Sequence, residues 1–187
     1  MYEKIREMIT LYQKYRDTDE KDYKEEADSL LDEIMESCNP PLSLSYKEGL
    51  CGIGAAIEYL IRNDFVDGDA DDILEAIDKA VVSAIHWRPR IGADIANGML
   101  GLACYLYHRL YYRIQSESPL VLDLKEQVIY LIDWMEESLR DQGVEKNYYE
   151  FYFVLIRLHQ LDIFNAKVEK MLVWCNKELE KKHLNNE

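Results

Sequence analysis

A glycine-containing segment recurs in this chain at an offset of 49 residues, and it constrains the fold more than any other feature. Gly49–Ile57 (GLCGIGAAI) aligns with Gly98–Leu106 (GMLGLACYL). Each copy opens a stretch that is apolar on nearly all sides, which is typical of a fully buried helix. A further step of 49 residues reaches Asn147, where a third apolar stretch begins without the glycines. A period of this length indicates an array of helical hairpins.

Buried and amphipathic helices alternate along the chain. The stretches that are apolar all round are Leu50–Ile61, Met99–Ile114 and Tyr148–Leu161, and each precedes an amphipathic stretch beginning near Ala70, Val121 and Val168. Two further amphipathic helices are expected at about Tyr2–Tyr15 and Tyr23–Glu36. We therefore predict an all-α fold, a single domain over residues 1–187, in which about four helical hairpins form two layers of a partial, open α/α toroid-like barrel.

The expected hairpin connections carry turn residues. They are Pro40–Pro41, Asp67–Gly68, Arg88–Gly92 and Ser116–Pro119. Because glycine and proline interrupt helices, we interpret these four segments as corners between helices, not as linkers between domains.

The chain is strongly acidic, but the charge is local. Thirty-six Asp and Glu against 22 Lys and Arg give a net charge of −14, and segments 17–36 and 64–78 together hold 17 carboxylates against two lysines. Segment 79–113 is basic, with five cations against Asp94. The acidic segments are either solvated helix faces or one side of a dipolar surface with a basic rim. Such an acidic protein is not expected to bind nucleic acid or an anionic membrane.

The remaining composition indicates a reduced, intracellular environment. Charged residues fill the first helix, so no signal peptide is expected, and we predict a cytoplasmic protein. Four dispersed cysteines, Cys38, Cys51, Cys104 and Cys175, include no C-x-x-C pair and argue against a disulfide scaffold. Cys51 begins a buried helix, where it is either a thiol of lowered pKa or a small core residue.

The best candidate site lies at the ends of the helices, beside the repeated glycines. Two glycines three apart let a backbone or a ligand approach a helix closely. Trp87 and two arginines precede the second glycine pair, and an arginine fork suits carboxylates or phosphates. The alternative is a structural corner capped by Asp94 or Asn97. The candidate binding residues are Tyr46, Gly49, Cys51, Gly52, Trp87, Arg88, Arg90, Asp94, Asn97, Gly98, Gly101, Tyr148, Tyr149 and Tyr152.

On these motifs the sequence resembles the lanthionine synthetase C-like (LanC-like) family. The resemblance rests on Gly49–Leu60 (GLCGIGAAIEYL), Arg62–Asp71 (RNDFVDGDAD) and Asn97–Leu106 (NGMLGLACYL), and it covers about residues 44–139. It implies an α/α toroid of six or seven hairpins, in which zinc activates cysteine thiols for addition to dehydrated residues of a precursor peptide. Six repeats of 49 residues would exceed this chain of 187.

The zinc motifs of the family are missing. The family holds zinc through a Trp-Cys-x-Gly segment and a Cys-His-Gly segment. Here Trp174–Cys175 is followed by Asn176 and Lys177, and Cys51 is followed directly by Gly52. The histidines, His86, His108, His159 and His183, show no ligand spacing. We therefore expect no metal and no cofactor.

Three hypotheses for function follow. The leading one is a non-catalytic protein that binds a peptide or a partner protein in a peptide-modification pathway of the lanthipeptide type. The second is a zinc-dependent enzyme of the lanthionine-synthetase type whose ring is completed by self-association, which would make it a homo-oligomer. The third is a glycan-binding relative of six-hairpin glycosidases, although no acid and base pair can be assigned.

Overall fold

The computed structural model, which describes residues 1–38, 43–141 and 146–184, is helical throughout that part of the chain, and it contains no strand there. Its helices are α1 (Tyr2–Thr18), α2 (Lys21–Glu36), α3 (Leu50–Arg62), α4 (Ala70–Trp87), α5 (Met99–Leu110), α6 (Pro119–Arg140), α7 (Tyr148–Gln160) and α8 (Asn165–Leu184). The all-α prediction is confirmed.

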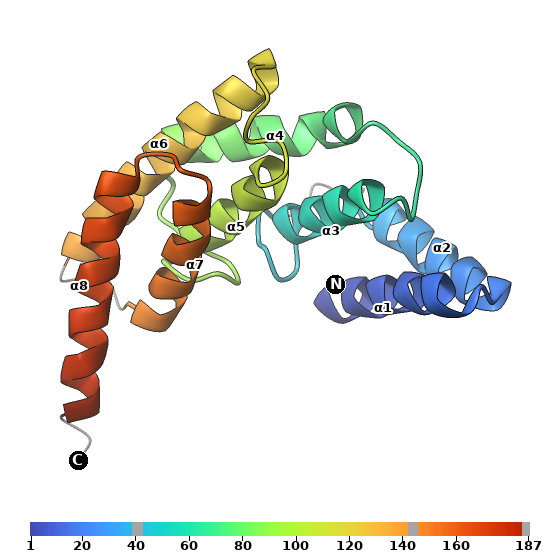
Figure 1. The fold of residues 1–187 in the computed structure, drawn as a ribbon, viewed down its shortest axis with the longest axis horizontal. Coiled ribbons are helices and arrows are strands. Elements are labelled where there is room, and N and C mark those ends of the chain that lie inside the picture. Colours follow the sequence, from blue (N-terminus) through green and yellow to red (C-terminus); the bar gives the residue numbers. More distant parts are fainter. Residues whose placement is uncertain (39–42, 142–145, 185–187) are drawn as a thin grey trace.

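The helices pair into four successive hairpins, α1–α2, α3–α4, α5–α6 and α7–α8. Across the hairpins α3 packs on α5 and α5 on α7, while α4 packs on α6 and α6 on α8. In Figure 1, α4, α6 and α8 follow the outside of an arc, and α3, α5 and α7 lie on its inner side. The two predicted layers are confirmed, and α1 joins the inner layer by packing on α3.

Local sequence sets where the helices begin. Ser118 accepts a hydrogen bond from the N–H of Val121 at 3.3 Å, and Pro119 stands in the first turn, so α6 begins there. Asp69 accepts from Asp71 in the same way, at 2.8 Å, at the start of α4. Asp67–Gly68, Arg88–Gly92 and Ser116–Pro119 lie at or beside corners, as predicted, whereas Pro40–Pro41 lies outside the described residues.

One predicted helix is shorter than expected. The apolar stretch from Met99 predicts a helix to Ile114, but α5 ends at Leu110 and the chain continues in turns. These turns carry Arg113 toward Asp71 at the start of α4, where its Nη1 donates at 2.6 Å. The early end of α5 thus places a cation beside the preceding hairpin.

The core lies between the two layers. Residues that are at most 1% exposed come from both, including Leu60, Leu74, Leu102, Tyr105, Leu124, Val128, Leu131 and Leu155. Their burial accounts for the 3.6-residue spacing of the outer helices and for the all-round apolar character of the inner ones. Within the described residues, no helix combines the length and the apolar character needed to cross a membrane.

Candidate functional site

The loops that lead into α3 and α5 share an equivalent backbone hydrogen bond. The N–H of Leu50 donates to the carbonyl oxygen of Ser43 at 2.9 Å, and the N–H of Met99 donates to that of Gly92 at 2.9 Å. Both donors and both acceptors are 49 residues apart, so the repeat predicted from the glycines is a repeat of loop structure.

The repeated glycines are required by the chain itself. A Cβ on Gly49 would collide with the carbonyl oxygen of Ser43, and one on Gly98 would collide with that of Gly92. Gly52 and Gly101 are covered in the same way, by the carbonyl oxygens of Tyr46 and Ile95 respectively. Of the two possibilities left open by the sequence, close approach of a backbone or of a ligand, it is the backbone that approaches these glycines.

The two loops also bind one another, as expected for neighbouring starts of inner helices. The N–H of Tyr46 donates to the carbonyl oxygen of Ala96 at 3.0 Å, and the Ser45 hydroxyl contacts Oδ1 of Asn97 at 2.9 Å. The N–H of Ile95 in turn donates to Glu150 in the first turn of α7, at 2.7 Å. Asn97 therefore holds one loop to the next.

The proposed basic rim beside Trp87 is largely neutralised, which corrects the interpretation of segment 79–113. Arg88 ends α4 in the left-handed conformation, with φ 44°, and pairs with Glu137 of α6 at 2.5 Å. Arg109 and Arg113 also pair with carboxylates. Trp87 is 83% exposed, and Arg90 is exposed. The corner presents an indole and one solvated guanidinium.

The other predicted residues are dispersed. Asp94 accepts from the N–H of Asn97 at 2.7 Å and lines a depression of about 580 Å³ together with Lys146, Asn147 and Lys182. Tyr148, Tyr149 and Tyr152 lie on α7, where Tyr148 is partly covered by the Lys182 ammonium and the other two are exposed. Of the predicted set, Tyr46 and Gly52 alone share a hollow that runs along the inner helices.

That hollow lies between α1, α3 and α5, and we call it the inner groove. Its main part has a volume of about 270 Å³. The small residues Gly52, Ala55 and Ala56 of α3 form its floor, since side chains at this spacing share one face of a helix. Its walls are Tyr2, Ile5, Arg6 and Ile9 of α1, Tyr59 of α3, His108 of α5 and Tyr46 of the preceding loop.

The inner groove continues toward the ends of α3 and α5. A second hollow of about 130 Å³ shares Tyr59 and His108 with the first. It is lined further by Glu58, Arg62, Asn63, Tyr107, Tyr111 and Tyr112. The groove as a whole thus has an apolar end of small residues and an aromatic end with a guanidinium.

Polar groups within the inner groove are arranged by hydrogen bonds. The Tyr46 hydroxyl lies 3.2 Å from Nε2 of His108, and the two rings stack with centroids 6.5 Å apart. Burial, reinforced by the charge of Arg157, lowers the pKa of His108, which favours the neutral imidazole, and a neutral imidazole nitrogen can accept a hydrogen bond from the Tyr46 hydroxyl. Tyr59 accepts from Nε2 of Gln13 at 2.9 Å.

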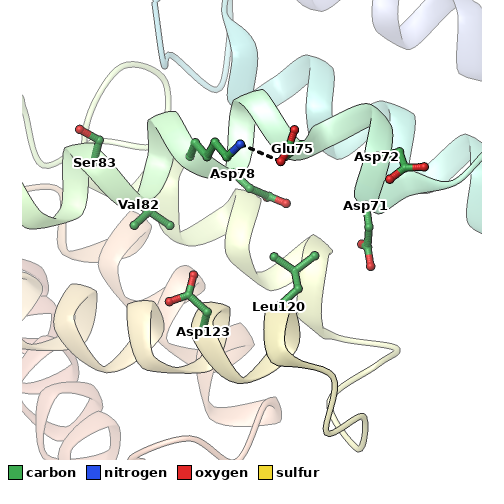
Figure 2. Close-up of a pocket in the computed structure, with 9 residues that line it drawn as sticks. Asp71, Asp72, Glu75, Asp78, Val82, Ser83, Leu120 and Asp123 are labelled. Carbon is green, nitrogen blue, oxygen red and sulfur yellow. Dashed lines mark hydrogen bonds and ion pairs between the residues drawn. The ribbon is translucent and has the colours of Figure 1, made fainter.

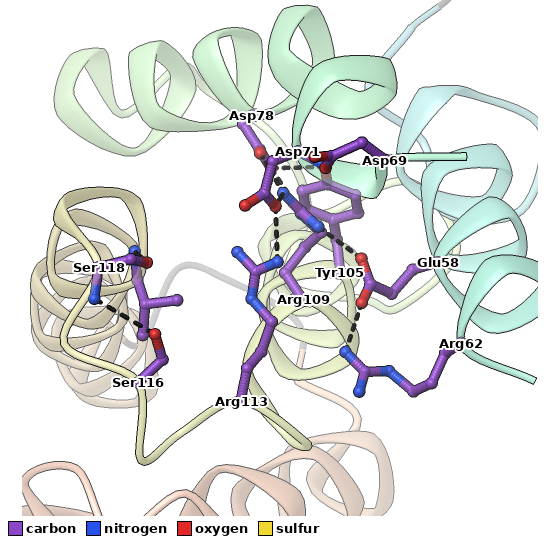
Figure 3. A network of polar contacts seen from close by, with 11 residues as sticks. Glu58, Arg62, Asp69, Asp71, Asp78, Tyr105, Arg109, Arg113, Ser116 and Ser118 are labelled. Atoms are coloured by element: carbon purple, nitrogen blue, oxygen red, sulfur yellow. Dashed lines mark hydrogen bonds and ion pairs between the residues drawn. The ribbon is translucent and has the colours of Figure 1, made fainter. Parts of the chain in front are cut away.

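Between α3, α4 and α5, a charged cluster surrounds a buried guanidinium. Arg109 is completely buried and donates to Glu58 of α3 at 2.5 Å and to both carboxylate oxygens of Asp78 of α4 at 3.1 and 2.8 Å. Figure 3 shows these side chains converging with Asp71, which Arg109 reaches at 2.9 Å, and with Tyr105, whose hydroxyl donates to Asp78 at 2.6 Å.

The protonation states of this cluster follow from its contacts. Burial alone would lower the pKa of Arg109, but the bonds to Asp78 and the charge of Glu58 outweigh it and raise the pKa, so the guanidinium stays charged. Burial likewise opposes ionisation of Asp71, yet Arg113 and Arg109 lower its pKa. The cluster ties α5 to α3 and to α4.

An acidic cleft opens beside this cluster, between α4 and α6. Its volume is about 510 Å³, and its lining includes Asp71, Asp72, Glu75 and Asp78 from α4 and Asp123 from α6. Figure 2 shows the carboxylates on both sides of the cleft. Asp71 and Asp78 are already bound to Arg109 and Glu75 to Lys79, so much of its charge is balanced within the protein.

The residues present do not fit the zinc site that the family resemblance implies. Burial raises the pKa of Cys51, Cys104 and Cys175 to about 12, which overturns the alternative of a Cys51 thiolate favoured by the helix terminus. Among the described residues, no group of three or more His, Cys, Asp or Glu side chains could hold a metal ion. The side chain of His183 lies outside the described residues.

Sequence reasoning missed two features that had visible signals. Glu58 and Arg109 are charged residues within stretches that are otherwise apolar all round, which indicates a buried pair. Gly52, Ala55 and Ala56 are small residues spaced along one face of such a helix, which indicates a depression.

Comparison of the chain with protein-family models, with curated proteins and with solved structures gave no match.

Proposed function

We propose that the protein is a non-catalytic helical-repeat protein that binds an extended peptide segment in the inner groove. The observation that carries the proposal is the groove itself, where a floor of small residues lies between aromatic walls. Aromatic rings offer large apolar surface at little entropic cost, and polar tips such as the Tyr46 hydroxyl fix orientation. Concave inner surfaces of helical repeats are common places for extended ligands.

The dimensions of the groove suit a short stretch of peptide. Gly52 and Arg62 lie ten residues apart on α3, which at 1.5 Å per residue corresponds to about 15 Å. An extended chain advances roughly 3.3 Å per residue, so about four or five residues would occupy the groove. The proposed ligand is thus a short linear segment of a peptide or of a partner protein.

The family resemblance supports the same class of ligand. A relation to LanC-like proteins, which act on precursor peptides, would place this chain beside peptide-modifying enzymes. The zinc ligands of that family are not reproduced among the described residues, and a binding role needs none of them. We therefore propose an accessory role in peptide modification, in which the protein holds a peptide without reacting with it.

Selection from a displayed library tests the proposal. Random dodecapeptides are panned against the wild-type protein and against Ile9→Trp, which places an indole inside the groove from its half-buried position on α1. Thr10→Trp is the matched control, because Thr10 is exposed and is absent from the groove lining. Wild-type protein and the Thr10 variant should enrich a shared set of peptides that the Ile9 variant fails to retain.

Two results would overturn the proposal. One is the absence of any peptide enriched above uncoated beads. The other is equal retention of the enriched peptides by the Ile9 and Thr10 variants, which would place binding elsewhere on the surface. Melting curves of both variants verify that they remain folded.

A further inference from the structure

The inner groove is cationic in an otherwise acidic protein. Arg6 and Arg62 belong to its lining. Arg16 donates a hydrogen bond to the backbone carbonyl of Asn63, which lines the far end of the groove. Arg157 lies on α7 and lines neither hollow. Burial raises the pKa of Tyr46 and of Tyr107 and lowers that of His108, and the charge of Arg157 opposes the first two shifts and adds to the third.

Two of these arginines are paired with carboxylates. Glu3 pairs with Arg6 at 2.7 Å, but both side chains are exposed at the rim, where such a pair is weak. Glu58 pairs with Arg62 at 2.6 Å, while Arg109, which also reaches Glu58, is held by Asp71 and Asp78 as well.

Three of the arginines have guanidinium N–H groups that remain available to a ligand. Within the part of the chain that the structure describes, neither Arg16 nor Arg157 forms an ion pair with a carboxylate. Their guanidiniums lie against aromatic rings instead, 3.7 Å from the centroid of Phe65 and 3.5 Å from that of Phe153. The Nε of Arg62 is buried without a hydrogen-bond partner. Stacking holds guanidinium planes in place and leaves their edges free to donate.

The net charge of −14 does not cancel this local charge. Most of the excess carboxylates lie in segments 17–36 and 64–78, which run from the end of α1 through α2 and from the end of α3 into α4, and none of them lines the groove. At physiological salt the Debye length is about 8 Å, so carboxylates farther than this from the groove are largely screened from a ligand in it. The charged groups that line the groove are Arg6, Arg62 and Glu58.

We propose that the inner groove selects peptides bearing a carboxylate, which binds at the aromatic end beside Arg62, with Arg16 and Arg157 nearby, while an apolar side chain of the same peptide lies over Ala55 and Ala56. This inference rests on the proposed function and adds the chemical class of the ligand. Ala55 and Arg62 are seven residues apart on α3, or about 10 Å. An extended peptide covers that span in roughly three residues, which sets the spacing of the two groups.

The library selection described above also tests this inference. The peptides that depend on the groove should be enriched in Asp or Glu about three positions from a large apolar residue. One such peptide is then synthesised with its acidic residue replaced by the matching amide, and both forms are titrated by fluorescence anisotropy. The amide form should bind the wild-type protein at least tenfold more weakly.

Variants assign the preference to particular arginines. Arg157→Gln and Arg16→Gln should each reduce the ratio of affinities for the acidic and amide peptides by at least threefold, with little change for the amide peptide. Arg140→Gln is the matched control, because it removes the same charge from an exposed position on α6. It should leave the ratio unchanged.

The outcomes separate the two proposals. Groove-dependent peptides without an acidic excess, or equal affinity for the acidic and amide forms, would overturn the carboxylate preference and leave the proposed function standing. An unchanged ratio in both Arg157→Gln and Arg16→Gln would overturn the assignment to these arginines. A selection that yields no groove-dependent peptide would overturn the proposed function, and this inference with it.

Discussion

The two sides of the α3–α5 pair show how the same helices build a closed region and an open one. Toward α4, Arg109 is fully buried and surrounded by carboxylates. Toward α1, the adjacent residue His108 borders the inner groove. One position along α5 therefore separates a guanidinium whose hydrogen bonds are made inside the protein from an imidazole within reach of a ligand.

The difference teaches where recognition is possible. Arg109 already donates to Glu58, Asp71 and Asp78, so it has little capacity for a ligand. Arg157 is stacked on a ring and has no ion pair among the described residues, so its donors remain available. Charge on its own does not mark a binding site, because the charge of Arg109 is already bound by carboxylates of the protein.

The largest effect is expected from breaking the closed side. Arg109→Met removes the only guanidinium that reaches both Glu58 and Asp78 in the described structure and leaves two nearly buried carboxylates without it. Loss of one partner from a buried ion pair costs about 3–5 kcal/mol of unfolding free energy. Urea denaturation measures the loss.

Arg140→Met is the matched control for this variant. Arg140 forms an ion pair with Glu136 at 2.6 Å, but its side chain is 66% exposed. Exposed pairs of this kind contribute about 0–1 kcal/mol. A loss for Arg109→Met no larger than that for Arg140→Met would show that the closed side does not stabilise the fold.

A smaller effect is expected at the loop end of the same helices. Gly98→Ala places a methyl group against the backbone of Gly92 and Asp94, and overpacking of this kind costs about 1–3 kcal/mol. Gly92→Ala is the control in the same loop, because its methyl group would meet only the flexible carboxylate of Asp94. In thermal unfolding, Gly98→Ala should have a lower melting temperature than Gly92→Ala. The reverse order would contradict the structural role of the repeated glycine.

The smallest effect is expected on the open side, as a dependence of stability on pH. Because burial lowers the pKa of His108 in the folded protein, the unfolded chain, with a histidine pKa of about 6.5, takes up the proton first. Between the two pKa values the unfolded state holds more protons, so the free energy of unfolding falls as the pH drops below about 6.5. Above that pH this contribution is fully present.

Urea denaturation across pH 5–8 checks this dependence. His108→Gln should flatten the part of the profile below about pH 6.5, while His86→Gln, which removes an exposed imidazole from α4, should not. Parallel profiles for wild-type protein and His108→Gln would mean that His108 does not lie in an environment that excludes its charged form.

The fold could be predicted from the sequence to a large extent, because helical periodicity and the 49-residue repeat are local patterns. The candidate site could be predicted only in part. The motif Gly49–Gly52 correctly marked a close approach, but sequence alone could not say that the carbonyl oxygens of Ser43 and Tyr46 make it. Tyr46 and Gly52 lie in the groove, whereas His108 and Ile9 come there through packing between hairpins, which no local pattern encodes.

The charged residues illustrate the same limit. Segment 79–113 is basic when counted along the chain, yet the partners of Arg88 and Arg109 come from α6, α3 and α4. Counting within a window cannot find a partner that is 51 residues away, as Glu58 is from Arg109. Net charge in a segment is therefore a poor guide to the charge that a ligand meets.

Because α1 forms one wall of the groove, binding of the proposed ligand there would be coupled to the docking of the first hairpin. That hairpin joins the array through the packing of α1 on α3, supported by contacts such as Tyr12 with Phe65. A ligand seated between α1 and α3 favours the docked hairpin over the detached one by RT ln(1 + [L]/Kd). Amide hydrogens of α1 and α2 would then exchange more slowly with solvent as the ligand concentration rises, so the first hairpin acts as a thermodynamic sensor of groove occupancy.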